Sequence, residues 1–152
     1  MKDPRQLPSQ LLVLLQFGLL LALAWVALPA ALTGAIPWAA WLSFGLALGL
    51  ALWAFTANRP GNFNIRPIPK AGGELVTHGP YRWMRHPMYT AFLLGAFALA
   101  RTADVSAAWL AWATLFLVLW VKSSLEERWM QVEHPGYADY RRRTRRFIPG
   151  LL

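Results

Sequence analysis

Long runs of apolar residues alternate with short polar segments along this chain. Residues 9–32 and residues 36–57 contain no charged side chain. Each run reaches the roughly 20 apolar residues that a helix needs to cross a bilayer. Between them, the stretch Thr33-Gly34-Ala35 followed by Pro37 predicts a tight turn. The pattern therefore predicts two antiparallel membrane-spanning helices in the first part of the chain.

Two shorter apolar runs follow a polar central region. Residues 87–102 and residues 105–122 are both near the lower limit of about 17 residues for a spanning helix. Arg101 and Asp104 stand at the junction, three positions apart, where opposite charges on a helix can pair. We therefore expect a compact helical hairpin here. The predicted fold is an all-α polytopic membrane bundle of four transmembrane helices, in a single domain of residues 1–152.

The basic residues fall on one side of this arrangement. Fifteen Lys and Arg stand against seven Asp and Glu, which gives a net charge of +8. They lie before the first run, in residues 58–86 and after the last run, whereas Arg101 falls on the other side. Because basic loops favour the cytoplasm, both termini are predicted to be cytoplasmic, which in a bacterium means the inner membrane. Residues 9–32 are longer than the roughly 7–15 apolar residues of a signal peptide, so we expect the first helix to be retained.

Composition excludes several other classes of protein. Hydrophobic residues make up 57% of the chain, above the roughly 45–50% of soluble proteins. The absence of Cys excludes a disulfide framework and a cysteine nucleophile. His78, His86 and His134 lack a recognisable metal-ligand spacing, so no metal site is expected. The arginines of residues 141–146 are expected to contact anionic membrane lipids rather than nucleic acid.

The segment of residues 72–89, GGELVTHGPYRWMRHPMY, is dense in Gly, Pro, His and Arg. Gly79-Pro80 predicts a turn, and Pro87 suits the first turn of the next helix. Arg85 and His86 would then stand at a helix N-terminus, where the partial positive charge and free N–H groups favour an anion. We expect a ligand's carboxylate or phosphate at this position.

A second polar segment, residues 122–129 (KSSLEERW), continues the last apolar run. At about 100° per residue, Lys122 and Glu126 share one side of the helix, whereas Glu127 is predicted to project towards water. Glu126 is therefore the better candidate for an inward role, since an ionisable residue at the edge of a span is costly unless partnered. Two interpretations of Lys122 need no functional role: its side chain snorkels to the membrane surface, or it forms an ion pair with Glu126. A carboxylate bound at Arg85 and an ammonium at Glu126 would together indicate an amino-acid-like ligand.

These two segments, LVTHGPYRWMRHPMY and EER followed by GYADYRRRTRRFIP, resemble the isoprenylcysteine carboxyl methyltransferase family of integral membrane enzymes. They are similar, more loosely, to the phospholipid N-methyltransferases. The resemblance covers about residues 58–149 and leaves the first predicted helix outside. It implies S-adenosylmethionine (SAM) as the methyl donor, in a cytoplasmic pocket closed by a helical lid of residues 123–152. The apolar stretch Phe147-Ile148-Pro149 would be the end of that lid.

The resemblance also implies roles for individual residues. Arg85, Lys122 and Glu126 would be catalytic, with Glu126 near the methionyl ammonium of SAM as well. Lys122 replaces a substrate-side arginine of the family, which keeps the charge but loses the planar fork of a guanidinium. The residues implied to contact the cofactor are Gly73, Glu74, Leu75, Val76, Tyr81, His86, Pro87, Met88, Tyr89 and Glu126.

The predicted function is SAM-dependent methyl transfer to a lipophilic or membrane-associated acceptor. In-line methyl transfer mainly requires the acceptor to be held close and aligned, and the aromatic ring of Tyr81, Trp83, Tyr89 or Trp129 would stabilise the sulfonium. An isoprenylcysteine-type carboxylate, a phospholipid amine and a small thiol all remain open as acceptors, as does the oligomeric state. Two other hypotheses are an NADPH-dependent membrane reductase of related helical arrangement and a small non-enzymatic membrane scaffold.

Overall fold

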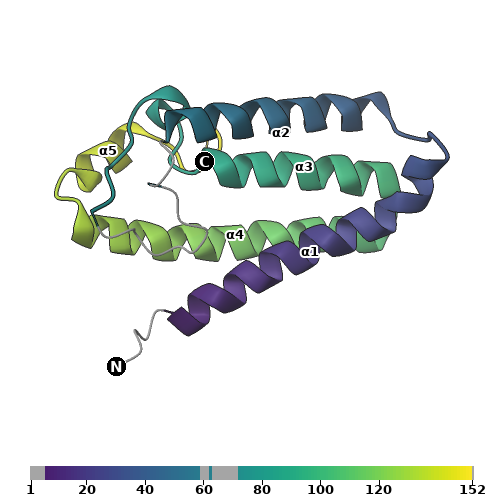
Figure 1. Cartoon of the computed structure of the whole chain (residues 1–152), viewed down its shortest axis with the longest axis horizontal. Coiled ribbons are helices and arrows are strands. Elements are labelled where there is room, and N and C mark those ends of the chain that lie inside the picture. Colours follow the sequence, from purple (N-terminus) through teal and green to yellow (C-terminus); the bar gives the residue numbers. More distant parts are fainter. Residues whose placement is uncertain (1–5, 59–61, 63–71, 152) are drawn as a thin grey trace.

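The computed structural model describes residues 6–58, 62 and 72–151. The described chain folds into helices, as predicted. They are α1 (Gln6–Leu32), α2 (Trp38–Ala57), the single 3-10 turn η1 (Gly79–Arg82), α3 (Pro87–Ala103), α4 (Ser106–Glu133) and α5 (Tyr137–Arg143). Figure 1 shows α2 and α3 side by side above α4, with α1 crossing α4 obliquely and with α5 at one end of the bundle. The predicted helix bounds hold within a few residues, and α4 continues past the predicted span into residues 122–129, as expected, and ends at Glu133.

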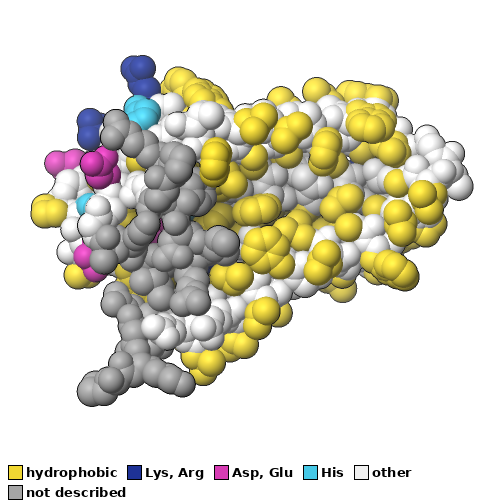
Figure 2. Space-filling view, viewed as in Figure 1, with side chains coloured by type: hydrophobic (Ala, Val, Ile, Leu, Met, Phe, Trp, Pro, Cys, Tyr) yellow, Lys and Arg dark blue, Asp and Glu magenta, His cyan; other side chains and the backbone are white. Residues whose placement is uncertain are grey.

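Within the described residues, three helices are long and apolar enough to cross a membrane, namely α1, α2 and α4. Helix α3 has 17 residues, so it is about 25 Å long at 1.5 Å per residue. Large apolar side chains face outward, and Leu21, Trp25 and Trp38 are exposed by 72%, 76% and 79%. Figure 2 shows apolar side chains along the helices and charged ones gathered at the end near α5. Such a surface fits a protein whose helices are covered by lipid.

Small residues fill the interior between the helices. Helix α2 packs on α3, and Ala54 and Ala96 are fully buried. The Ser43 hydroxyl on α2 donates a hydrogen bond to the Leu94 carbonyl of α3 over 2.8 Å. Small residues and interhelical hydrogen bonds of this kind allow helices to approach closely in a membrane. A cluster of leucines and alanines joins α1, α3 and α4 on the other side of the bundle.

The connections form as the sequence predicts. Arg101 and Asp104 pair over 3.0 Å at the end of α3, and Asp104 closes this helix with a left-handed backbone, φ 50°. At the other end of the bundle, Gly79 opens η1 with φ +60°. A Cβ atom on Gly79 would lie 2.7 Å from the Cβ of Ala57 in α2. Only glycine therefore allows this turn to pack against the end of α2. The chain then continues from the turn to Pro87, the first residue of α3.

Candidate functional site

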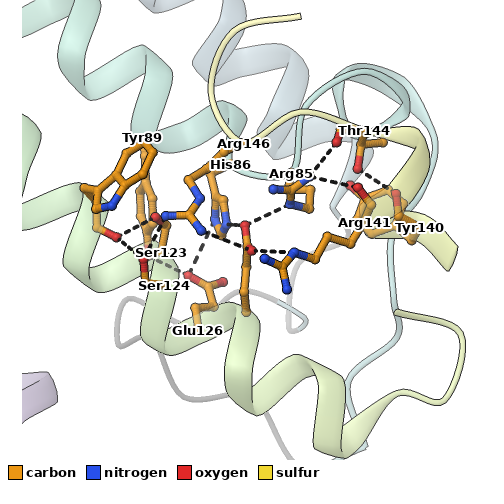
Figure 3. A network of polar contacts seen from close by, with 12 residues as sticks. Arg85, His86, Tyr89, Ser123, Ser124, Glu126, Tyr140, Arg141, Thr144 and Arg146 are labelled. Atoms are coloured by element: carbon orange, nitrogen blue, oxygen red, sulfur yellow. Dashed lines mark hydrogen bonds and ion pairs between the residues drawn. The ribbon is translucent and has the colours of Figure 1, made fainter. Parts of the chain in front are cut away.

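The two polar segments converge where α3 begins and where α4 continues beyond the apolar part of the bundle (Figure 3). His86 precedes α3 and is 6% exposed. Its imidazole lies between two glutamates of α4, with Nδ1 3.8 Å from Glu126 Oε2 and Nε2 3.1 Å from Glu127 Oε1. The Tyr89 ring stacks on His86, and the Tyr89 hydroxyl donates to Glu126 Oε2 over 2.7 Å. The predicted neighbourhood of His86, Tyr89 and Glu126 is therefore present.

Glu127 is buried, so the prediction that it projects towards water is wrong. Its side chain is 3% exposed. Oε1 accepts a hydrogen bond from Arg85 Nε over 2.8 Å. Oε2 lies 3.4 Å from Arg141 Nε and 3.4 Å from Arg146 Nη2. Glu127 belongs to the same polar cluster as Arg85 and His86. The sequence analysis missed this because it placed Lys122 and Glu126, but not Glu127, on the inward side of the helix.

The buried side of α4 includes a second row of residues beside Val118 and Lys122. Leu115, Leu119 and Ser123 are all fully buried, and they are spaced four residues apart, as residues on one face of a helix are. The next position in this series is Glu127. The signal was therefore present in the sequence, but the C-terminal part of the chain that covers this face could not be placed from periodicity alone.

The anion next to Arg85 and His86 is an internal carboxylate. Besides its bond to Glu127, the Arg85 guanidinium donates from Nη1 to the carbonyl oxygens of Thr144 and Arg141, over 2.5 and 3.2 Å. The expected anion-binding position at the start of α3 is thus filled by Glu127 rather than left to a ligand's carboxylate. This geometry gives Arg85 a role in holding the C-terminal residues.

Lys122 is buried inside the bundle, so the two predictions for it, snorkelling and an ion pair with Glu126, are both wrong. It is 1% exposed, so it does not snorkel. It forms no ion pair within 4.0 Å with the described side chain of Glu126. Instead, Lys122 Nζ donates to Gln16 Oε1 on α1 over 2.6 Å and lies 5.1 Å from the centroid of the Tyr89 ring. The only sequence signal for this partner is a lone amide in a charge-free apolar run, and Gln16 is itself 1% exposed.

The implied adenosine-lining residues lie in a segment without helix or strand. The main chain of Glu74 donates to Asn62 Oδ1 over 2.9 Å, and its carbonyl accepts from Asn62 Nδ2 over 2.9 Å. Gly73, Leu75 and Val76 are half-buried, whereas the Glu74 side chain is exposed. Within α3, Pro87 is buried and Met88 is half-buried. The roles of these residues stay predictions.

Tyr81 lies in η1, near the same cluster. Its carbonyl accepts a hydrogen bond from the Tyr140 hydroxyl of α5 over 2.8 Å. Burial, with a smaller contribution from the negative charge of Glu126, raises the pKa of the Tyr81 hydroxyl to about 12. Burial also raises the pKa of Tyr140. Both hydroxyls therefore stay protonated and neutral at physiological pH.

The chain returns to the start of α3 after α5. The Arg85 amide donates to the Arg145 carbonyl over 2.8 Å, and the His86 amide donates to the Arg146 carbonyl over 3.1 Å. The Arg145 amide donates to the Trp83 carbonyl over 3.1 Å. The two bonds of Arg145 form an isolated parallel bridge between residues 84 and 145. Two stretches about 60 positions apart are thereby held together beside His86.

Side chains of the same returning stretch complete the cluster. Phe147 is 1% exposed, and its ring centroid lies 6.0 Å from the rings of His86 and Trp120. The Arg146 guanidinium lies 4.4 Å over the Trp120 ring and donates to Ser124 Oγ over 2.7 Å. Phe147 therefore packs beside His86, and closure of a cofactor pocket by this stretch stays a prediction.

The Glu126 carboxylate lies at the edge of the cluster. Glu126, with a side chain 32% exposed, offers a carboxylate that is fixed by Tyr89 and close to the surface. Such a carboxylate can accept hydrogen bonds from an ammonium group. Within the described ranges, no group of three or more His, Asp or Glu is placed to hold a metal ion.

Fold and site together describe an all-helical membrane-type protein with a polar site at one end of its bundle. The chain belongs to the phospholipid methyltransferase (PEMT) family, whose model matches residues 35–134, about two thirds of the chain. The match includes α2, η1, α3 and all of α4, whereas α1 and α5 lie outside it. The family resemblance inferred from the sequence is thereby confirmed.

Two curated relatives are named for metal resistance. The cobalt-zinc-cadmium resistance protein CzcN of Cupriavidus metallidurans is 36% identical over 83 residues, which are 54% of this chain and 38% of that protein. The nickel-cobalt-cadmium resistance protein NccN of Alcaligenes xylosoxydans xylosoxydans is 34% identical over 79 residues, 51% of this chain and 37% of that protein. The chain thus spans less than two fifths of the length of these relatives. No solved structure gives a significant match.

Proposed function

We propose that this protein is an integral membrane methyltransferase that uses SAM to methylate a lipophilic or membrane-associated acceptor. The observation that carries the proposal is the convergence of His86, Tyr89 and Glu126 at the end of the bundle. Membership of the phospholipid methyltransferase family supports the reaction class. The apolar exterior of the long helices supports an acceptor that arrives through the bilayer.

The residues present fit the amino-acid end of SAM. Among the described residues, the hydrogen-bond and ion-pair partners of the Glu126 carboxylate are Tyr89 and His86. Since a carboxylate has about four acceptor positions, capacity remains for an ammonium group. The Tyr89 ring already stacks on His86 and faces the Lys122 ammonium, so we propose the ring of Tyr81, Trp83 or Trp129 for the sulfonium contact. When bound, SAM supplies the electrophilic methyl group, and the chain supplies its orientation.

Lys122 is proposed to act on the acceptor. It occupies the hydrocarbon side of the site, between Gln16 and Tyr89, one helical turn before Glu126. A buried ammonium favours an anionic acceptor atom nearby. A carboxylate or thiolate needs no general base before it attacks, whereas a protonated amine must first lose a proton. We therefore propose an isoprenylcysteine-type carboxylate, or a similar lipophilic anion, as the acceptor.

The proposed topology has four crossings and cytoplasmic termini. The α1–α2 and α3–α4 connections lie at one end of the bundle in Figure 1, and α5 and η1 lie at the other. Because the chain contains no Cys, single-cysteine variants can report each end. In intact cells, an impermeant maleimide should label Thr33→Cys and Asp104→Cys but should label Gly136→Cys only after permeabilisation. If Asp104→Cys behaves like Gly136→Cys, α3 and α4 do not cross the membrane.

Substitution of one glutamate tests the cofactor site. We expect Glu126→Gln to weaken SAM binding at least about tenfold in titration calorimetry, since hydrogen bonds to charged groups contribute about 1.5–3 kcal/mol. Glu133→Gln, an exposed position on the same helix, should bind SAM like the unmodified protein. Transfer of labelled methyl from SAM into extracted membranes would then identify the acceptor. The proposal fails if the unmodified protein binds no SAM, and thermal protection by NADPH but not by SAM would favour a reductase.

A further inference from the structure

We infer that Glu127 is a positioning residue that anchors the C-terminal segment, defined as residues 141–147, and thereby holds His86 beside Glu126. The inference concerns a residue that the proposed function does not use directly. Its link to cofactor binding rests on that proposed function, whereas the anchoring itself does not.

One carboxylate joins three separate parts of the chain. Before α3, Glu127 contacts Arg85 over 2.8 Å and His86 over 3.1 Å. Within α5, it contacts Arg141 over 3.4 Å, and after α5 it contacts Arg146 over 3.4 Å. The contacts are shielded from water, since the Glu127 and Arg85 side chains are 3% and 9% exposed. Attraction between these charges is therefore screened less than on an open surface.

The cluster contains more positive than negative charge. Three guanidinium groups, those of Arg85, Arg141 and Arg146, surround the single carboxylate of Glu127. The neighbouring Glu126 faces Tyr89 and His86 instead. Without the Glu127 charge, the three guanidinium groups would repel one another in a partly buried place. Besides the backbone hydrogen bonds of this segment, the charge of Glu127, rather than its shape, is what this residue contributes to holding it.

His86 depends on this segment in two ways. The His86 amide donates to the Arg146 carbonyl, and the Phe147 ring lies 6.0 Å from the imidazole. Glu127 also fixes the imidazole directly through Nε2. If the segment leaves, His86 loses these contacts and exposes its ring to water. The orientation of its Nδ1 towards Glu126, and with it the ammonium-binding carboxylate, would no longer be fixed.

Limited trypsin digestion in detergent, without any cofactor, tests the anchoring. Glu127→Gln preserves the shape of the side chain and removes its charge. We expect cleavage after the exposed arginines 142, 143 and 145 to become at least about tenfold faster than in the unmodified protein, because several hydrogen bonds to a charged group are weakened. Glu133→Gln removes a charge from the exposed side of the same helix and should leave the cleavage rate unchanged. An unchanged rate in Glu127→Gln overturns the inference.

A milder variant covers the case in which Glu127→Gln fails to fold. Arg141 is 49% exposed and touches Glu127 from the rim of the cluster, so Arg141→Gln removes one contact and leaves the others. We expect it to accelerate C-terminal cleavage severalfold while the melting temperature stays unchanged. The same cleavage rate as in the unmodified protein would overturn the inference.

Kinetics then test the link to the cofactor. In whichever variant folds, we expect the KM for SAM to rise several times more than kcat falls, since an opened segment leaves the cofactor site loosely formed. A fall in kcat with unchanged KM would indicate only a smaller folded fraction and would overturn the positioning role. If the unmodified protein neither binds SAM nor transfers methyl, the proposed function fails, but the proteolysis result still decides whether Glu127 anchors the segment.

Discussion

Replacing Gln16 by leucine tests why a lysine is buried inside the bundle. Lys122 and Gln16 are each 1% exposed, and their side chains are joined by a hydrogen bond of 2.6 Å between α4 and α1. Leucine has nearly the volume of glutamine but accepts no hydrogen bond. The Lys122 ammonium would therefore stay buried beside the Tyr89 ring without its hydrogen-bond acceptor.

The expected loss follows from the charge of the donor. A hydrogen bond to a charged group contributes about 1.5–3 kcal/mol, so Gln16→Leu should lower the free energy of unfolding by about that amount. Lys122→Met leaves a neutral buried amide unpaired, which costs about 1–3 kcal/mol. Replacing both partners by apolar residues is often close to neutral. The double variant should therefore lose about 2.5–6 kcal/mol less than the sum of the two single losses.

Unfolding in mixed micelles, followed by the fluorescence of the nine Trp, measures these free energies. Ser43→Ala is the control, because it removes another buried interhelical hydrogen bond far from the site and should cost about 0.5–1.5 kcal/mol. A double variant that is as stable as the unmodified protein but inactive would show that the pair serves function. The reasoning is refuted if Gln16→Leu changes the free energy by less than about 0.5 kcal/mol or if the single losses add.

Three further substitutions test separate parts of the structure, each by thermal or denaturant unfolding. Phe147→Ala should cost about 3–5 kcal/mol, because the ring is 1% exposed, and a loss below 1 kcal/mol would mean that the C-terminal residues are not packed in solution. Gly79→Ala should cost about 1–3 kcal/mol through crowding and strain at φ +60°, whereas Gly45→Ala, in open space on α2, should be neutral or slightly stabilising. Equal effects at the two glycines would contradict the close approach of η1 to α2. Arg101→Ala should cost less than about 1 kcal/mol, since its partner Asp104 is 67% exposed, and a larger loss would show that this pair has a buried role.

The helices were predictable because their signals are local. Charge-free runs long enough to cross a bilayer define α1 and α2, and Pro87 stands at the first position of α3, where a proline is tolerated. The continuation of α4 past residue 122 was predicted through residue 129, but its end at Glu133 was not. Counting apolar residues locates the part that lipid covers, but the helix continues to Glu133 through residues that favour helix in water and stops before Pro135-Gly136.

The partners of the charged side chains were not predictable in the same way. Lys122 and Gln16 are 106 positions apart, and nothing in either neighbourhood specifies the other. Whether Glu126 or Glu127 is the buried glutamate depends on which side of α4 is covered by other parts of the chain. Glu127 is covered by residues after α5, such as Arg146. Periodicity places side chains on faces of a helix, but tertiary packing decides which face is buried.

The extension of α4 beyond the apolar part of the bundle explains how so short a chain assembles a site. Lys122, Glu126 and Glu127 lie within two helical turns, yet their side chains contact three different parts of the chain. Lys122 reaches α1, Glu126 reaches Tyr89 on α3, and Glu127 reaches the C-terminal segment. At about 100° per residue, Glu126 lies about 40° from Lys122 and Glu127 lies about 140° from it, so one rigid helix fixes the three directions relative to one another. The angular positions of these three residues around α4 therefore organise the site. It forms only when α1, α3 and the C-terminal segment all pack against that single helix.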